Sequence, residues 1–156
     1  MKKLLKERWG FIIVIIFSLL GLFASFILTY DEYIITKNPE INLPCNINSV
    51  FNCTSVMKSE YSHLLGFPNP WLGMIGYTAM GVFGLYGLLG LSKKTLYDIF
   101  TIGSLLSAIF SWYLMYISKV VLEIYCIYCI ISCISATVIL IVNVYNRKEK
   151  VIKVQK

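Results

Sequence analysis

Four stretches of apolar residues constrain the fold of this chain more than any other feature. They cover about residues 9–30, 71–91, 96–118 and 121–145. A helix of roughly 20 residues crosses the hydrocarbon core of a bilayer, so each stretch is long enough to span a membrane. Only 14% of the residues are charged, whereas a soluble domain carries about 25%. The sequence therefore predicts an all-α integral membrane protein, a four-helix bundle that forms one domain over residues 1–156.

Basic residues lie mainly on one side of the expected membrane. Eleven of the 14 Lys and Arg residues precede the first stretch, separate the second from the third, or follow the fourth in the tail 146–156. The positive-inside rule places both termini and this tail in the cytoplasm, which leaves segment 31–70 outside. The first stretch is longer than the apolar core of a signal peptide, so we expect a retained helix. Topology and contact with anionic lipid account for the net charge of +6 without nucleic-acid binding. We expect the protein in a cytoplasmic membrane.

The outer segment 31–70 is long for a loop in a helix bundle, and long loops are often functional. Its residues 54–65 place apolar side chains at helical intervals, and Asn52 is suited to cap such a helix. The GFPNP stretch at 66–70 ends it. We expect a short amphipathic helix here, with Cys53 in its first turn, where the helix N-terminus lowers the pKa of a thiol.

Four of the five cysteines form two pairs, Cys45-x7-Cys53 in the outer segment and Cys126-x2-Cys129 at the outer start of the fourth stretch. Residues three apart share a helix face, and Cys129 would lie about 4.5 Å deeper than Cys126. Both pairs are then expected at the same face of the membrane. A relay that carries electron pairs between a protein thiol and a lipid-soluble acceptor needs this arrangement.

Other uses of the cysteines are less consistent with the spacing. A haem-c site requires a His after the CxxC pair, where this chain has Ile130. Zinc pairs usually lie on turns rather than in a helix that enters lipid, so we expect no metal site. Purely structural disulfides remain an alternative, because the outer face is usually oxidising. Cys133 is expected to be a small buried apolar residue.

Charged residues are rare within the apolar stretches. No Asp, Glu, Lys, Arg or His is evident in their central parts, which argues against an ion-coupled transporter. Asp98 opens the third stretch, where we expect it to complement the helix dipole. His63 is expected at the surface.

Taken together, these motifs resemble those of the vitamin K epoxide reductase family in its prokaryotic, single-domain form. The two cysteine pairs carry the resemblance, together with the stretches CTSVMKSEY at 53–61 and GFPNPWLG at 66–73. The pairs occur in the order typical of this family, whereas in the unrelated DsbB-type oxidases the CxxC pair comes first. The similarity extends over about Cys45 to Cys133 and, through the expected topology, nearly the whole chain.

The resemblance implies a quinone-linked thiol-disulfide oxidoreductase. A secreted thioredoxin-fold (DsbA-like) partner, supplied in trans, would reduce a Cys45–Cys53 disulfide, with Cys45 facing the partner. Cys53 would pass the electrons to Cys126, and Cys129 would pass them to a membrane quinone, which is menaquinone, ubiquinone or vitamin K. This reaction would support disulfide formation in exported proteins.

The resemblance also implies that Ser59 and Asn69 contact the quinone, although each side chain could instead cap local backbone. Family members that act on vitamin K often carry a Tyr four residues after the second CxxC cysteine, where this chain has Cys133. A vitamin K quinone or epoxide reductase using the same relay is therefore the second hypothesis. A non-enzymatic membrane scaffold with structural disulfides is the third.

Overall fold

In the computed structural model the chain is a bundle of long helices, described here for residues 2–41, 43–48, 50–64, 66–91 and 94–154. The long helices are α1 (Lys2–Lys37), α3 (Asn69–Leu88), α4 (Lys94–Tyr116) and α5 (Ile127–Val154). Each contains a segment long and apolar enough to cross a membrane. No strand occurs among the described residues. The predicted all-α fold with four membrane helices is thereby confirmed.

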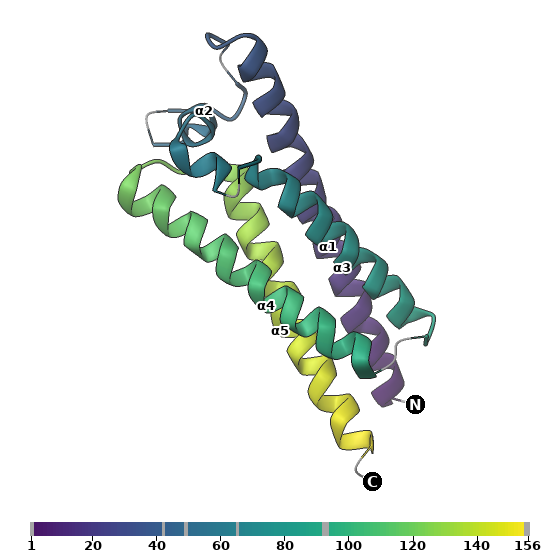
Figure 1. Ribbon diagram of the computed structural model, residues 1–156. Coiled ribbons are helices and arrows are strands. Elements are labelled where there is room, and N and C mark those ends of the chain that lie inside the picture. The colour runs from purple at the N-terminus through teal and green to yellow at the C-terminus, as the bar shows by residue number, and fades with distance from the viewer. Residues whose placement is uncertain (1, 42, 49, 65, 92–93, 155–156) are drawn as a thin grey trace.

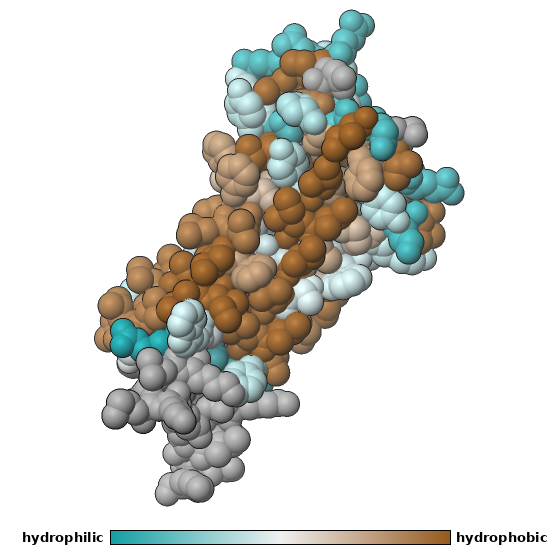
Figure 2. All heavy atoms as spheres, turned by 180° about the vertical axis from the view of Figure 1, so that it is seen from behind, coloured by the Kyte–Doolittle hydropathy of each residue, from teal (hydrophilic) through white to brown (hydrophobic). Residues whose placement is uncertain are grey.

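Helix α1 lies between α3 and α5, and α4 packs against the other side of α5 (Figure 1). The two termini lie at one end of the bundle, and the short helix α2 (Cys53–Met57) lies at the opposite end (Figure 1). We call these the inner end and the outer end. On the face seen in Figure 2, the surface between the two ends is largely apolar, and hydrophilic side chains gather at the outer end. This pattern is what a helix bundle surrounded by lipid requires.

Small residues allow α1 and α3 to approach closely. A Cβ atom added to Gly84 of α3 would lie 2.7 Å from Cγ1 of Ile15 in α1, whereas one added to Gly76 would meet nothing within 4 Å. Small residues at helix interfaces serve this purpose in membranes, where lipid offers no hydrophobic drive for helix association. The glycine-rich second span thus packs tightly against α1 at Gly84 and has open space beside Gly76.

Aromatic packing and an ion pair hold the inner end. Phe83 of α3 stacks on Phe100 of α4, with the ring centroids 4.2 Å apart. Asp98 of α4 accepts a hydrogen bond of 2.7 Å from Nε of Arg147 in α5. Asp98 was expected to interact with its own helix dipole; instead it joins two helices, a contact that local sequence could not reveal.

The outer segment contains two short helical turns where one amphipathic helix was expected. Helix α2 begins after Asn52, whose side chain accepts a hydrogen bond of 3.0 Å from the Ser55 amide, so the predicted cap is confirmed. The helix ends at Met57, and a 3₁₀ turn, η1 (Glu60–His63), follows. Ser59 separates the two because its backbone is extended and its hydroxyl donates to the carbonyl of Val56 at 2.7 Å. Local side-chain bonding of this kind competes with helix continuation.

The connection from α4 to α5 is irregular. The chain leaves α4 through a π-helical turn, η2 (Ile117–Val121), and α5 starts only at Ile127. Glu123 adopts a positive φ of 53° between them, and the Ser118 hydroxyl donates to the carbonyl of Ile124. Cys126 therefore precedes the helix, and Cys129 lies in its first turn.

Candidate functional site at the outer end of the bundle

The outer segment contains a disulfide between Cys45 and Cys53, whose Cα atoms are 5.8 Å apart. Cys53 is the first residue of α2, so the Asn52 cap fixes its position. Both cysteines are buried, in a cluster that also contains Leu28 and Ile35 of α1. The disulfide thus lies on the outer part of α1 rather than at the surface of a free loop.

Backbone hydrogen bonds join this segment to the start of α5. The Tyr125 amide donates to the Val50 carbonyl at 2.7 Å, and the Asn52 amide donates to the Tyr125 carbonyl at 3.1 Å. These bonds form an isolated parallel bridge between Phe51 and Tyr125. Because Cys53 follows Phe51 by two residues and Cys126 follows Tyr125 directly, the bridge sets the two cysteine pairs side by side.

The bridge leaves the Cys126 sulfur 3.5 Å from the Cys53 sulfur, in a buried environment. The amide of Cys129 donates to the Cys126 sulfur at 3.4 Å. Hydrogen bonding from Cys129 lowers the pKa of Cys126, although burial acts in the opposite direction. A lowered thiol pKa favours the thiolate, which is the nucleophile in disulfide exchange.

A cavity of about 520 Å³ lies beneath these cysteines, between the helices. Its walls are mainly apolar side chains of α1, α3 and α4, with hydroxyl groups at intervals. The lining residues with polar or thiol side chains are Ser25, Glu32, Ser59, Tyr61, Ser62, Asn69, Tyr77, Ser107, Ser111, Ser118, Cys126, Cys129 and Ser132. Ligand sites of this size combine apolar walls with a few polar groups that fix orientation. A quinone suits such a lining, because it has a flat apolar ring and two carbonyl groups that accept hydrogen bonds.

Comparison with known protein families gives a match over most of the chain. The sequence model of the vitamin K epoxide reductase family matches residues 12–144, which include α3 and α4, most of α1 and α5, and both cysteine pairs. The chain belongs to this family. A comparison with curated proteins found no match. Membership makes the chain an integral membrane oxidoreductase that links protein thiols to a quinone.

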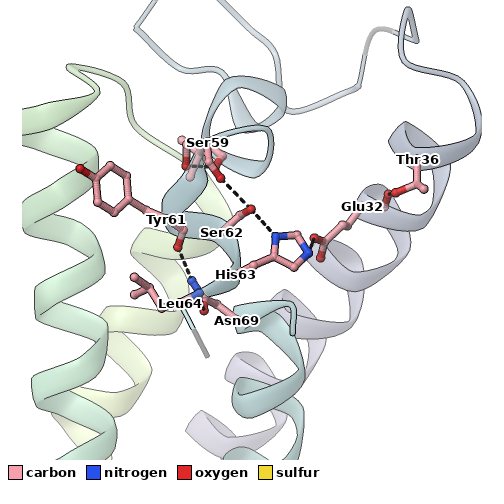
Figure 3. Close-up of polar contacts among 9 residues, drawn as sticks. Glu32, Thr36, Ser59, Tyr61, Ser62, His63, Leu64 and Asn69 are labelled. Carbon is pink, nitrogen blue, oxygen red and sulfur yellow. Dashed lines mark hydrogen bonds and ion pairs between the residues drawn. The ribbon is translucent and has the colours of Figure 1, made fainter. Parts of the chain in front are cut away.

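Ser59 and Asn69, the two residues that the family resemblance assigns to the quinone, both line the cavity. The polar atoms of both side chains form hydrogen bonds to backbone groups. Ser59 bonds to Val56, as described above. Asn69, the first residue of α3, donates to the Tyr61 carbonyl at 2.7 Å and accepts from the Leu64 amide at 3.3 Å (Figure 3). Asn69 thereby ties η1 to the start of α3. Contact of either side chain with a quinone stays a prediction.

Sequence reasoning missed an acid–base pair beside the cavity. Helix α1 continues past the apolar stretch to Lys37, so Glu32 lies on the helix and lines the cavity. Its carboxylate is 3.1 Å from Nε2 of His63 in η1 (Figure 3). Glu32 follows the buried Leu28 by four residues and precedes the buried Ile35 by three. That helical spacing was the signal that could have placed it on the inward face.

Cys133, the fifth cysteine, is buried one turn beyond Cys129. It does not line the large cavity; it faces a separate apolar hollow with Trp112 and Tyr125. Its expected burial is confirmed.

Proposed function

We propose that this protein re-oxidises a secreted thioredoxin-fold partner and passes the electrons through two cysteine pairs to a membrane quinone. The observation that carries the proposal is the 3.5 Å separation of the Cys53 and Cys126 sulfurs, with Cys53 already in a disulfide and Cys129 on the cavity wall. Purely structural disulfides do not require a thiol of another pair at this distance. The product is oxidised partner, which supports disulfide formation in exported proteins.

The relay consists of thiol-disulfide exchanges that conserve electrons. A thiolate of the reduced partner attacks the Cys45 sulfur, which releases Cys53 as a thiolate, and the second partner thiol then releases Cys45. Cys53 next attacks the Cys126 sulfur of an oxidised Cys126–Cys129 pair and frees Cys129. Cys45 closes the loop disulfide again and frees Cys126. The net result is one disulfide formed in the partner and one dithiol left at Cys126 and Cys129.

The last step takes place at the cavity. A bound quinone supplies an acceptor for two electrons and two protons. Cys129 lies on the cavity wall, so its sulfur is placed to react there while Cys126 stays next to Cys53. The hydroxyl groups of the lining provide donors for quinone oxygens, and the apolar walls fit the ring and its lipid-soluble tail.

The direction of the relay requires the cysteine pairs to be outside the cytoplasm. The concentration of basic residues at the inner end supports cytoplasmic termini. Cys45 is 5% exposed and Cys53 is fully buried. Of the two, Cys45 is thus nearer to an incoming partner, and attack on it requires the segment before α2 to move outward.

Reconstituted protein tests the proposal. Purified protein in lipid vesicles with a quinone and a reduced thioredoxin-fold protein should form quinol and oxidised partner in equal amounts. Cys129→Ala should abolish quinol formation, whereas Cys133→Ala, a matched removal of one thiol in the same helix, should retain it. Quinol formation by Cys129→Ala at the wild-type rate would show that the relay is wrong.

A further inference from the structure

The cysteine relay leaves one ionisable pair at the cavity without a role. Glu32 of α1 and His63 of η1 form this pair, with Oε1 and Nε2 3.1 Å apart (Figure 3). The Glu32 side chain is 13% exposed and lines the same cavity as Cys129, whereas the His63 side chain is 48% exposed. The pair therefore connects the solvent at the outer end with the interior of the cavity.

Neighbouring hydrogen bonds define where the protons of His63 lie. The Ser62 hydroxyl donates its one proton to the Ser59 carbonyl at 2.9 Å. Its oxygen is also 2.7 Å from Nδ1 of His63. Because the hydroxyl proton is already used, Nδ1 must carry a proton and donate to Ser62. Nε2 is then the ring nitrogen that lies 3.1 Å from Oε1 of Glu32, so a proton that passes between the two groups would pass at this position.

The proposed relay creates a need for such a proton. Closing the Cys126–Cys129 disulfide from one thiolate and one thiol releases two electrons and one proton. Forming a quinol takes up two of each, so one further proton is needed. The other ionisable residues that line the cavity, besides the two thiols, are Tyr61 of η1 and Tyr77 of α3, and phenols are much weaker acids than carboxylic acids. Asp31, the neighbour of Glu32 on α1, is buried but does not line the cavity.

We propose that Glu32 is a catalytic proton donor to the quinone and that His63 resupplies its proton from the outer solution. This inference rests on the function proposed above. Glu32 gives its proton to a quinone oxygen as electrons leave Cys129, and the carboxylate takes the Nε2 proton of His63. Neutral His63 keeps its Nδ1 proton on Ser62 and is protonated again at Nε2 by water. One of the two protons follows this route in each turnover.

Two substitutions and a matched control test the route in the reconstituted system. Glu32→Gln should keep the shape of the cavity and the quinone KM but lower kcat for quinol formation by about 100-fold or more, the usual contribution of a general acid. Glu40→Gln, at an exposed site in the same outer segment, should leave kcat unchanged. His63→Ala should lower kcat, and imidazole added to the outer buffer should restore it. Wild-type kcat should fall at alkaline pH, where fewer protons are available from the outer solution, and this fall should be absent in Glu32→Gln.

A second readout needs neither quinone nor turnover. His63 is the only histidine of the chain, so nitrogen NMR of isotope-labelled histidine reports it alone. Neutral His63 should be protonated at Nδ1, and Ser62→Ala should shift the population toward the Nε2-protonated tautomer.

The outcomes separate this inference from the proposed function. If single-turnover exchange with the partner is normal in Glu32→Gln and only quinol formation is slow, the proton route is supported. Wild-type kcat and an unchanged pH profile in Glu32→Gln would overturn it. Loss of partner exchange together with quinol formation in that variant would also overturn it, because the defect would then be structural. Failure of the wild-type protein to reduce any quinone would instead refute the proposed function.

Discussion

Asn69 allows a direct test of whether its side chain acts on neighbouring backbone groups or on the quinone. Its amide group satisfies two backbone groups of the preceding segment, the Tyr61 carbonyl and the Leu64 amide. Asn69→Ala removes both partners at once. Each half-buried group left without a partner costs about 1–2 kcal/mol, so opening of segment 59–64 should become easier by about 2–4 kcal/mol. Since about 1.4 kcal/mol corresponds to a factor of ten, amide hydrogen exchange in this segment should accelerate by about 30- to 700-fold.

Hydrogen-exchange mass spectrometry of the protein in detergent or nanodiscs, without quinone, measures this change. Asn38→Ala serves as the control, because Asn38 is exposed and follows α1 at the same end of the molecule. Exchange in α4 and in the inner half of α5 should be unaffected by either substitution. If Asn69→Ala leaves exchange at 59–64 unchanged but raises the quinone KM, the scaffold reasoning is refuted, and Asn69 acts on the ligand directly.

Two further predictions concern helix packing and the reactive thiol. Gly84→Ala should lower the free energy of unfolding by about 1–3 kcal/mol, because the added Cβ would collide with Ile15. Gly76→Ala should leave the free energy of unfolding unchanged. Equal stability of the two variants in a denaturation assay in detergent would contradict this. Hydrogen bonding from Cys129 lowers the pKa of Cys126. In a Cys133→Ala background, the ultraviolet absorbance of the Cys126 thiolate should therefore develop at a lower pH than that of a free cysteine. Cys129→Ala should move that midpoint to higher pH, and no movement would show that the Cys129 thiol is not the cause.

The features that sequence reasoning predicted are those set by local composition. Hydropathy over some 20 residues defines a membrane helix, and the spacing of Cys126 and Cys129 is itself local. The Asn52 cap also depends only on residues within one turn. These properties can be read without knowledge of which helices touch.

The features that were missed depend on contacts between distant segments. The pairing of Asp98 with Arg147 requires knowing that α4 and α5 meet at their inner ends. The pairing of Glu32 with His63 requires both the extension of α1 and the position of η1. The break at Ser59 follows from one hydroxyl that bonds backward instead of facing solvent, and helical periodicity carries no information about that choice.

The bridge between Phe51 and Tyr125 has a consequence for how the protein responds to its lipid surroundings. Helices in bilayers of different thickness tilt to match the hydrocarbon layer, and such tilting changes the spacing of residues on separate helices. Cys53 and Cys126 are joined through a few residues of directly bonded backbone, so their sulfurs move together with the start of α5. If the proposed relay operates, exchange between the pairs would therefore not depend on membrane thickness. The shape of the cavity would depend on it, because its walls come from α1, α3, α4 and α5. Lipid chain length would then act on quinone entry and leave the sulfur-to-sulfur step unchanged.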